Sequence, residues 1–300
     1  MSTFLLLSLD SPFSRTVLQT LLDVGHPPAA LILPNPDRTA PLASFPALTN
    51  QPTDQLLPTQ LPNTNTLTQT ASLHQIPLLT LGNLRHPGAL AALRAYKPDF
   101  LVTACFPRLL PADMLAIPRV GCLNLHPSLL PAYRGPEPLF WQYYFGETRT
   151  GVTLHWMDEG ADTGDLLAQA EVPFPDGISL AEAETRTALV GGALLARALA
   201  DPQARLRIPQ PAQGASAHPR PTADSLVIST AWTARRAFNF LCAARAWGPF
   251  EIVEEGSGQR LRVRGALGWG HGAGTMPPFQ TGEEGVAVRF ADGVVQVERA

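Results

Sequence analysis

An amide and an imidazole close one short apolar segment in the middle of the chain. Asn124 and His126 stand two positions apart at the end of the stretch 121–126, whose other members are glycine, cysteine and leucine. Because side chains alternate along a strand, both should project from the same face, about 7 Å apart. A carboxamide donates hydrogen bonds to an oxygen that gains negative charge, and a histidine accepts a proton or, when protonated, stabilises the same oxygen. Neither group is an obvious nucleophile, so the pair predicts direct transfer between two bound substrates.

A carboxylate farther along the chain is the third candidate. Asp162 is flanked by Gly160 and Gly164, which predicts a loop flexible enough to bring its carboxylate to the imidazole. There it would orient the ring and favour its charged form. The same acidic stretch is also compatible with a solvated turn or a calcium loop, but its spacing does not fit an EF-hand, so we expect no metal.

Other interpretations of these residues stay open. A lone histidine before a proline is commonly a hydrogen-bonded structural residue. A Cys-His acyl enzyme is conceivable because Cys122 shares the face of His126, but four residues of strand separate them by about 13 Å, too far for a hydrogen bond. The three cysteines show no CxxC spacing, which argues against a disulfide framework and a zinc site.

Composition excludes some classes of protein. The 300 residues carry a formal net charge of -3, with a pI of about 6.2, which gives no general attraction for polyanions. No apolar run reaches the roughly 18 residues of a membrane span, and the N-terminus lacks the basic region of a signal peptide. We therefore expect a cytoplasmic protein with no membrane partner.

Apolar runs and helical periodicity alternate through the first two thirds of the chain. They predict strands at 4–9, 29–33, 76–81, 99–106, 121–125 and 166–172, and helices at 12–22, 87–96, 112–116 and 179–199. This alternation favours an α/β doubly wound sheet, in which ligands lie beyond the carboxyl ends of the strands. The turn after the first strand has no glycine, so a dinucleotide cofactor is disfavoured.

Three other regions complete the expected layout. Residues 34–73 are rich in Pro, Thr, Asn, Gln and Leu and predict a long irregular insertion. Residues 208–221 predict a linker between a domain at 1–207 and a smaller one at 222–300. The smaller domain should hold a helix around 234–242 and a β-barrel or sheet. Its arginines 260, 262 and 264 would form either a nucleic-acid face or an ordinary exposed face of a sheet.

The motifs around these candidate residues resemble a known family. The stretches 124–135 (NLHPSLLPAYRG), 151–155 (GVTLH) and 157–165 (MDEGADTGD) closely resemble the 10-formyltetrahydrofolate-dependent formyltransferases. Within that family, the two-domain layout is most similar to the methionyl-tRNA formyltransferases. The resemblance is strong over about residues 98–172 and weaker in the C-terminal region.

The resemblance implies a fold and a set of functional residues. It implies a Rossmann-like formyltransferase domain with a smaller, OB-like C-terminal β-barrel domain. Asn124, His126 and Asp162 would be catalytic, transferring a formyl group from the co-substrate 10-formyltetrahydrofolate without a metal. The folate would lie near three segments, formed by Phe106, Arg108, Leu109 and Leu110, by Ser128, Leu129, Leu130 and Pro131, and by Asp158, Glu159 and Gly160.

The acceptor amine is less clearly implied. Family members that modify tRNA resemble one another in a basic loop after the second strand, whereas residues 39–84 here contain neither Lys nor Arg. Because tRNA binding uses such charges on phosphates, this departure counts against tRNA. Initiator Met-tRNA remains the leading acceptor because of the C-terminal region. The alternatives are a nucleotide-linked amino sugar or another small amine, and a non-catalytic folate- or RNA-binding protein.

Overall fold

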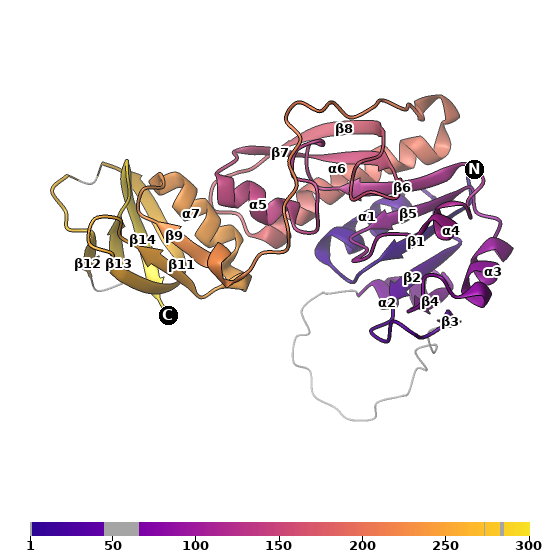
Figure 1. The fold of residues 1–300 in the computed structure, drawn as a ribbon, viewed down its shortest axis with the longest axis horizontal. Helices are drawn as coiled ribbons and strands as arrows, with labels where there is room; N and C mark the ends of the chain where they lie inside the picture. The colour runs from indigo at the N-terminus through magenta and orange to yellow at the C-terminus, as the bar shows by residue number, and fades with distance from the viewer. Residues whose placement is uncertain (1, 45–65, 273, 283–284) are drawn as a thin grey trace. The chain divides into compact units, whose positions relative to one another are not determined.

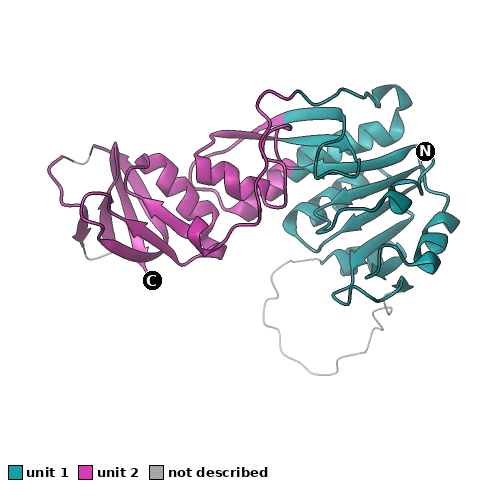
Figure 2. Ribbon diagram, viewed as in Figure 1, with its two compact units in different colours: residues 1–126, 152–170, 188–211 teal, residues 127–151, 171–187, 212–300 magenta. Residues whose placement is uncertain are grey.

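The structure, a computed structural model, describes residues 2–44, 66–272, 274–282 and 285–300. These residues form two compact units, which Figure 2 colours separately. The first unit comprises residues 1–126, 152–170 and 188–211, and the second comprises 127–151, 171–187 and 212–300. Packing therefore groups segments that are separated in the sequence. The linear boundaries at 207 and 221 stay a prediction.

An eight-stranded sheet organises the first unit (Figure 1). Its order is β3-β4-β2-β1-β5-β6-β7-β8. The pairings from β4 through β2, β1 and β5 to β6 are parallel, whereas β3 pairs antiparallel with β4, and β7 pairs antiparallel with β6. The strands are β1 (Phe4–Ser8), β2 (Ala30–Pro34), β3 (Ala43–Ser44), β4 (Leu78–Leu81), β5 (Phe100–Ala104), β6 (Gly121–His126), β7 (Arg149–Trp156) and β8 (Leu166–Pro173). This order confirms the predicted mixed α/β architecture and sets the carboxyl ends of β5 and β6 side by side.

Helices cover both faces of this sheet because its central strands are apolar on both sides. Phe4 and Leu6 pack in one core with α1, α2 and part of α6, whereas Leu5 and Leu7 pack in another with α3 and α4. The helices are α1 (Pro12–Asp23), α2 (Leu67–Leu73), α3 (Pro87–Ala95), α4 (Ala112–Leu115) and α6 (Leu180–Ala200). Serine side chains cap two of these helices: Ser11 accepts a hydrogen bond from the Ser14 amide, and Ser179 accepts one from the Glu182 amide.

The expectation that residues 34–73 are irregular is wrong for two parts of this region. Residues 43–44 form β3, and residues 67–73 form α2. Thr66 and Gln69 form a capping box, each side chain accepting a hydrogen bond from the other's backbone amide. The Thr-x-x-Gln spacing is typical of the start of a helix, although the composition of the surrounding residues is typical of loops. Residues 45–65 lie outside the described part.

The second unit contains a six-stranded sheet, two complete helices and the first part of α6. The sheet order is β12-β13-β14-β11-β10-β9, and α5 and α7 share its apolar core through Phe140 and Phe240, whose rings meet edge to face at 5.3 Å. Its helices are α5 (Pro138–Phe145) and α7 (Ala234–Ala243), and its strands are β9 (Val227–Ser229), β10 (Phe250–Val253), β11 (Arg260–His271), β12 (Phe279–Thr281), β13 (Val286–Arg289) and β14 (Gly293–Arg299). Two 3-10 turns, η2 (Ala223–Leu226) and η3 (Arg245–Trp247), also lie in this unit, whereas η1 (Pro202–Ala204) lies in the first. The predicted C-terminal β-domain is thus present, and its OB-like character stays a prediction.

An aromatic cluster fixes part of the predicted linker within the second unit. The His218 ring stacks on Trp141 at 5.2 Å and on Tyr133 at 5.5 Å between centroids. The Trp141 indole N–H donates to the Pro219 carbonyl at 2.8 Å, and Arg134 and Ala217 form a parallel bridge. Residues 216–219 are therefore held by ring contacts and backbone pairing.

The sequence reasoning assigned neither α5 nor β7. The aromatic run at 141–145 is not preceded by a side-chain cap, so the sequence carries no signal for the start of α5. Strand β7 is buried at every position except its first, so it lacks the alternation of polar and apolar residues that marks a half-exposed strand. No helix among the described residues combines the length and the apolar composition that crossing a membrane requires.

Candidate active site

The Asn124 carboxamide is held between the two strands that flank β6. Thr103 on β5 and His155 on β7 are both register partners of Asn124. The Thr103 hydroxyl donates to Asn124 Oδ1 at 2.6 Å, and Asn124 Nδ2 lies 3.1 Å from His155 Nε2. The amide is thus anchored at its oxygen and at its nitrogen by neighbouring strands.

Hydrogen-bond chemistry fixes the tautomer of His155. Its Nδ1 lies 2.8 Å from the Trp156 carbonyl oxygen, which can only accept, so Nδ1 carries the hydrogen in the neutral ring. Nε2 is then an acceptor and receives an N–H from Asn124. The opposite orientation of the carboxamide would direct its oxygen at Nε2 and at a carboxylate, both of which are acceptors. Asn124 therefore directs its amide nitrogen away from β5.

Asp162 joins this group from the loop between β7 and β8. Its Oδ1 accepts a hydrogen bond from Asn124 Nδ2 at 3.1 Å and lies 3.6 Å from His126 Nδ1 and 3.5 Å from His155 Nε2. Asp162 adopts a left-handed backbone conformation with φ of 57°, which aspartate tolerates better than most residues. The structure thus brings Asn124, His126 and Asp162 together, as the sequence reasoning expected.

The loop that carries Asp162 is closely packed against its surroundings. Gln210 donates from Nε2 to the carbonyl oxygens of Asp162 at 2.8 Å and Gly164 at 2.7 Å. Gly164 has no room for a Cβ because the Trp156 carbonyl oxygen occupies that space. The loop is therefore a fixed turn rather than the flexible segment that its glycines suggested.

His126 ends β6 and is almost entirely buried, with 4% of its surface exposed. Its ring meets the His155 ring edge to face at 6.5 Å between centroids. Nδ1 faces Asp162, so the carboxylate can fix the orientation of the ring. A buried imidazole beside a half-buried amide and a half-buried carboxylate is suited to stabilising charge that develops on a small bound group.

Two of the predicted folate segments lie in the same unit. Phe106, Arg108, Leu109 and Leu110 follow β5 directly; Leu110 is buried and Leu109 is 59% exposed. In the other segment, the Asp158 carboxylate accepts from the Gly160 amide at 3.0 Å and from the Thr163 hydroxyl at 2.7 Å, and Glu159 is exposed. Asp158 thus shapes the turn that presents Asp162.

The third predicted segment, Ser128 to Pro131, belongs to the second unit. The buried Ser128 hydroxyl donates to the Ala132 carbonyl at 2.7 Å, and Leu130 is buried. Ser128 thus stabilises its own turn, and a contribution of this segment to folate binding stays a prediction.

Sequence reasoning missed Thr103, His155 and Gln210. The first two were visible as polar residues interrupting buried apolar strands, at positions where a hydrogen-bond partner is required. Gln210 lies in the segment expected to be a linker, where a single amide carries no recognisable signal.

Cys122 does not provide a thiolate nucleophile. Burial raises the pKa of its thiol to about 12, and the sulfur lies 3.7 Å from the Leu115 carbonyl oxygen. The thiol is therefore protonated at neutral pH, which disfavours the acyl-enzyme alternative.

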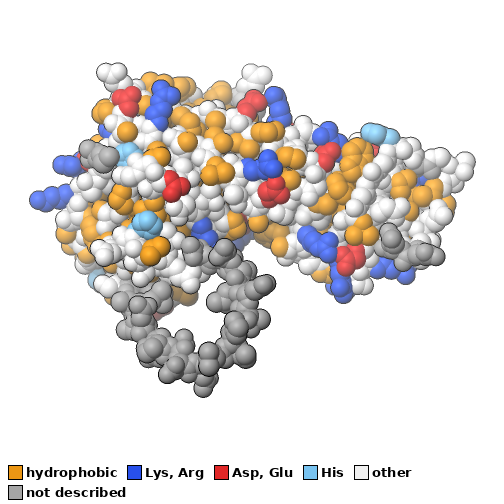
Figure 3. Space-filling view, turned by 180° about the vertical axis from the view of Figure 1, so that it is seen from behind, with side chains coloured by type: hydrophobic (Ala, Val, Ile, Leu, Met, Phe, Trp, Pro, Cys, Tyr) orange, Lys and Arg blue, Asp and Glu red, His pale blue; other side chains and the backbone are white. Residues whose placement is uncertain are grey.

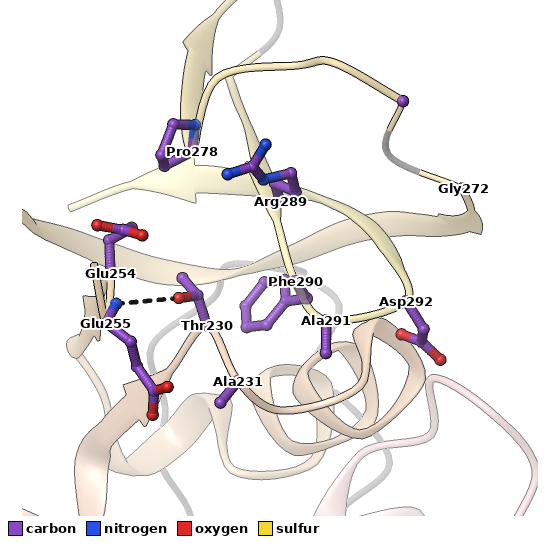
Figure 4. Close-up of a pocket in the computed structure, with 11 residues that line it drawn as sticks. Thr230, Ala231, Glu254, Glu255, Gly272, Pro278, Arg289, Phe290, Ala291 and Asp292 are labelled. Atoms are coloured by element: carbon purple, nitrogen blue, oxygen red, sulfur yellow. Dashed lines mark hydrogen bonds between the residues drawn. The ribbon is translucent and has the colours of Figure 1, made fainter. Parts of the chain in front are cut away.

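A separate cavity of about 530 Å³ lies in the second unit (Figure 4). Three carboxylates, from Glu254, Glu255 and Asp292, and one guanidinium, from Arg289, line it. A pocket with more carboxylates than guanidinium groups repels phosphates, so it does not suit a nucleic-acid backbone.

Basic side chains are scattered over the face drawn in Figure 3, and several of them lie beside Asp or Glu. On β11, Arg260 forms an ion pair with Glu251 at 2.7 Å. Arg262 and Arg264 border a second cavity of about 540 Å³ together with Arg245, which pairs with Glu298 at 2.5 Å.

Known sequences provide an independent comparison. Residues 16–199 match the sequence profile of the formyl transferase family. The methionyl-tRNA formyltransferase of Syntrophus aciditrophicus (strain SB) is 45% identical over 129 residues, which cover 43% of this chain and 41% of that protein. The methionyl-tRNA formyltransferase of Synechococcus sp. (strain JA-3-3Ab) is 35% identical over 240 residues, covering 77% of this chain and 74% of that protein.

Solved structures share the fold. The N-formyltransferase from Helicobacter canadensis, in complex with folinic acid and dTDP-3-aminofucose, covers 100% of this chain and 99% of its own with a TM-score of 0.66 at 16% identity. Methionyl-tRNA formyltransferase from Clostridium thermocellum covers 100% of both chains with a TM-score of 0.55 at 11% identity. At these identities the likeness concerns the fold alone.

Proposed function

The chain belongs to the formyl transferase family, and we propose that it transfers the formyl group of 10-formyltetrahydrofolate to the amine of an acceptor. The observation that carries this proposal is the contact of Asn124 and His126 with the single carboxylate of Asp162. We propose that these three residues are catalytic, that residues 106–110, 128–131 and 158–160 line the folate site, and that the C-terminal domain is OB-like.

In the proposed reaction, the acceptor nitrogen attacks the formyl carbon. A new C–N bond forms while the carbonyl electron pair moves to the formyl oxygen, and the bond to N10 then breaks. The acceptor nitrogen loses a proton and N10 gains one, so the products are the formamide and tetrahydrofolate. Asn124 and His126 stabilise the formyl oxygen as it gains charge, and Asp162 orients His126.

The resting hydrogen bonds of Asn124 limit how it can act. Both hydrogens of Nδ2 have acceptors, in Asp162 Oδ1 and His155 Nε2. Donation to the formyl oxygen therefore requires that the substrate share or replace one of these acceptors. Apo geometry of this kind commonly rearranges when the substrate binds.

Initiator Met-tRNA is the acceptor that we propose first, because two curated relatives with 35% and 36% identity, each over 77% of the chain, are named methionyl-tRNA formyltransferases. A nucleotide-linked amino sugar is the second candidate. The absence of Lys and Arg from residues 39–84 favours it, since a tRNA acceptor needs cationic contacts to its phosphates.

The test uses the purified full chain with 10-formyltetrahydrofolate and either charged initiator tRNA or a panel of amino sugar nucleotides. Release of tetrahydrofolate and the mass of the acceptor would identify the product. We expect Asn124→Ala and His126→Ala to lower kcat roughly 100-fold or more. For the carboxylate, Asp162→Asn removes the charge while keeping a side chain that tolerates the left-handed backbone.

His74→Ala is the matched control, because His74 is an exposed histidine at the end of α2. Its kinetics should equal those of the wild type. Wild-type rates in all three active-site variants would refute the proposed mechanism. Folate binding without turnover on any acceptor would instead support a non-catalytic binding protein.

A further inference from the structure

Two fully buried serine hydroxyls converge on one carbonyl oxygen at the end of β5. Ser8 is the last residue of β1 and the register partner of Ala104, and Ser14 lies in the first turn of α1. The Ser8 hydroxyl donates to the Ala104 carbonyl at 2.8 Å, and the Ser14 hydroxyl donates to the same oxygen at 2.9 Å. All three residues are 0% exposed. One carbonyl oxygen thus accepts hydrogen bonds from side chains of two different elements, which engages both of its lone pairs.

This carbonyl belongs to the residue before a left-handed turn. Cys105 has a φ of 57°, which few residues other than glycine, asparagine and aspartate adopt. Ala104 and Cys105 both pack in the core that contains α1, whereas Phe106 packs in the core that contains α3 and α4. Neighbouring side chains of a regular strand point to opposite faces, so the turn at Cys105 ends the alternation of β5. The turn therefore sets the direction in which residues 106–110 leave the sheet.

Strand pairing holds β5 only as far as this carbonyl. The register pairs of β5 with β1 and with β6 both end at Ala104. The next backbone contact, from the Leu9 amide to the Cys105 carbonyl, is 3.2 Å long. Thr103 lies inside both ladders, whereas residues 106–110 lie beyond them. Loss of the two serine hydrogen bonds should therefore displace residues 106–110 and leave Thr103 in place.

We propose that Ser8 and Ser14 are positioning residues for the folate. Their hydroxyls hold the Ala104 carbonyl, and through the turn at Cys105 they fix the place of residues 106–110. The assignment to the folate rests on the proposed formyl transfer, whereas the hold on the turn does not. Two donors on one acceptor also imply a non-additive loss, because either hydroxyl can hold the carbonyl when the other is removed.

Alanine variants of the two serines test this proposal. Ser8→Ala and Ser14→Ala should each raise the KM for 10-formyltetrahydrofolate by about twofold or less, and the double variant should raise it roughly tenfold. The KM for the acceptor and kcat should stay within about twofold, because Thr103 keeps its place. Each single variant also acts as a rescue of the double variant, since it restores one hydroxyl.

Two measurements without turnover accompany the kinetics. Titration with folinic acid, the folate present in the Helicobacter canadensis complex, should give dissociation constants in the same order as the KM values. Hydrogen exchange in peptides covering residues 103–110 should accelerate in each single variant and most in the double variant. Exchange reports the hold on the turn, and titration reports its consequence for the folate.

Thr187→Val is the matched control for the loss of a buried hydroxyl. Thr187 is fully buried in α6, where its hydroxyl donates to the Ala183 carbonyl at 2.8 Å. Valine keeps the shape of the side chain and removes only this donor. Folinic acid affinity and exchange in residues 103–110 should both equal those of the wild type.

The proposal is overturned if the double variant Ser8→Ala/Ser14→Ala binds folinic acid as tightly as the wild type, or if Thr187→Val weakens binding equally. Parallel increases in the KM values for the folate and the acceptor would also overturn it, because they indicate a general loss of structure. If the double variant does not fold, the single variants decide, and unchanged exchange in residues 103–110 of both refutes the hold on the turn. A wild type that binds no folinic acid would refute the proposed folate site, a failure that the exchange rates distinguish from a failure of the serines to hold the turn.

Discussion

Asn124 and His155 face each other across the antiparallel pairing of β6 and β7, with the amide nitrogen 3.1 Å from Nε2 of the ring. With Thr103 bound to the amide oxygen on the other side, the carboxamide has one orientation before any substrate arrives. Electrostatic stabilisation is most effective when the donors are already in place, because no reorganisation is then needed during the reaction. The two flanking residues should therefore affect the rate more than substrate affinity.

Replacing His155 by phenylalanine should lower the rate of transfer. The variant His155→Phe keeps a ring of similar size on β7 but removes the acceptor at Nε2 and the donor to the Trp156 carbonyl. Without this acceptor the half-buried Asn124 carboxamide is held less firmly in its one orientation, so kcat should fall roughly tenfold while the KM for folate stays within about twofold. Steady-state kinetics with both substrates measure this, with His74→Phe as the exposed control. A raised KM with an unchanged kcat would show that His155 acts in binding instead.

Thr103→Val tests the other end of the carboxamide. Valine has nearly the same shape as threonine but cannot donate to Asn124 Oδ1, so it leaves this half-buried acceptor without its donor. We expect kcat to fall roughly tenfold, and Thr103→Ser, which restores the hydroxyl, to recover most of it. If the serine variant were no faster than the valine variant, the hydroxyl would not be the relevant group.

The alternation of side chains explains why part of this site could be predicted. Asn124 and His126 lie two residues apart on one strand, so local geometry alone places them together, and the glycines around Asp162 indicated a turn. His155 joins them only because β7 returns antiparallel beside β6 in a register that pairs it with Asn124. That register depends on packing across the unit and not on residues 151–155 themselves.

The fold shows the same limit. The parallel strands of the first sheet are continuous apolar runs, so their local composition is enough to predict them. By contrast, α5 and β7 depend on burial by segments that are distant in the sequence. In residues 66–73, capping chemistry outweighed a loop-like composition. Contacts between residues far apart in sequence, such as Gln210 with Asp162, leave no local pattern to read.

Removing the Gln210 amide should loosen the loop that carries Asp162. Gln210→Ala abolishes the hydrogen bonds to the carbonyls of Asp162 and Gly164, which hold a residue with positive φ in place. Hydrogen exchange should accelerate in peptides covering 157–165, and kcat should fall roughly tenfold because Asp162 no longer holds His126 firmly. Gln203→Ala, at an exposed position in η1, should change neither quantity. Faster exchange with a normal kcat would separate loop order from catalysis.

The His218 ring should make stability depend on pH below neutrality. Burial lowers the pKa of His218 in the folded protein, whereas in the unfolded chain it should titrate near 6.5. As pH falls through about 6.5, the unfolded chain binds this proton first, so the contribution of His218 is complete above that pH and declines below it. Urea unfolding between about pH 7.5 and 5 should show this decline. His218→Phe keeps an aromatic ring against Tyr133 and Trp141 but cannot titrate, so its stability should fall less with acid. Burial raises the pKa of Glu137, whose effect is common to both proteins and cancels in their difference. Identical pH slopes of stability for the two proteins would show that the pKa of His218 does not differ between the folded and the unfolded chain.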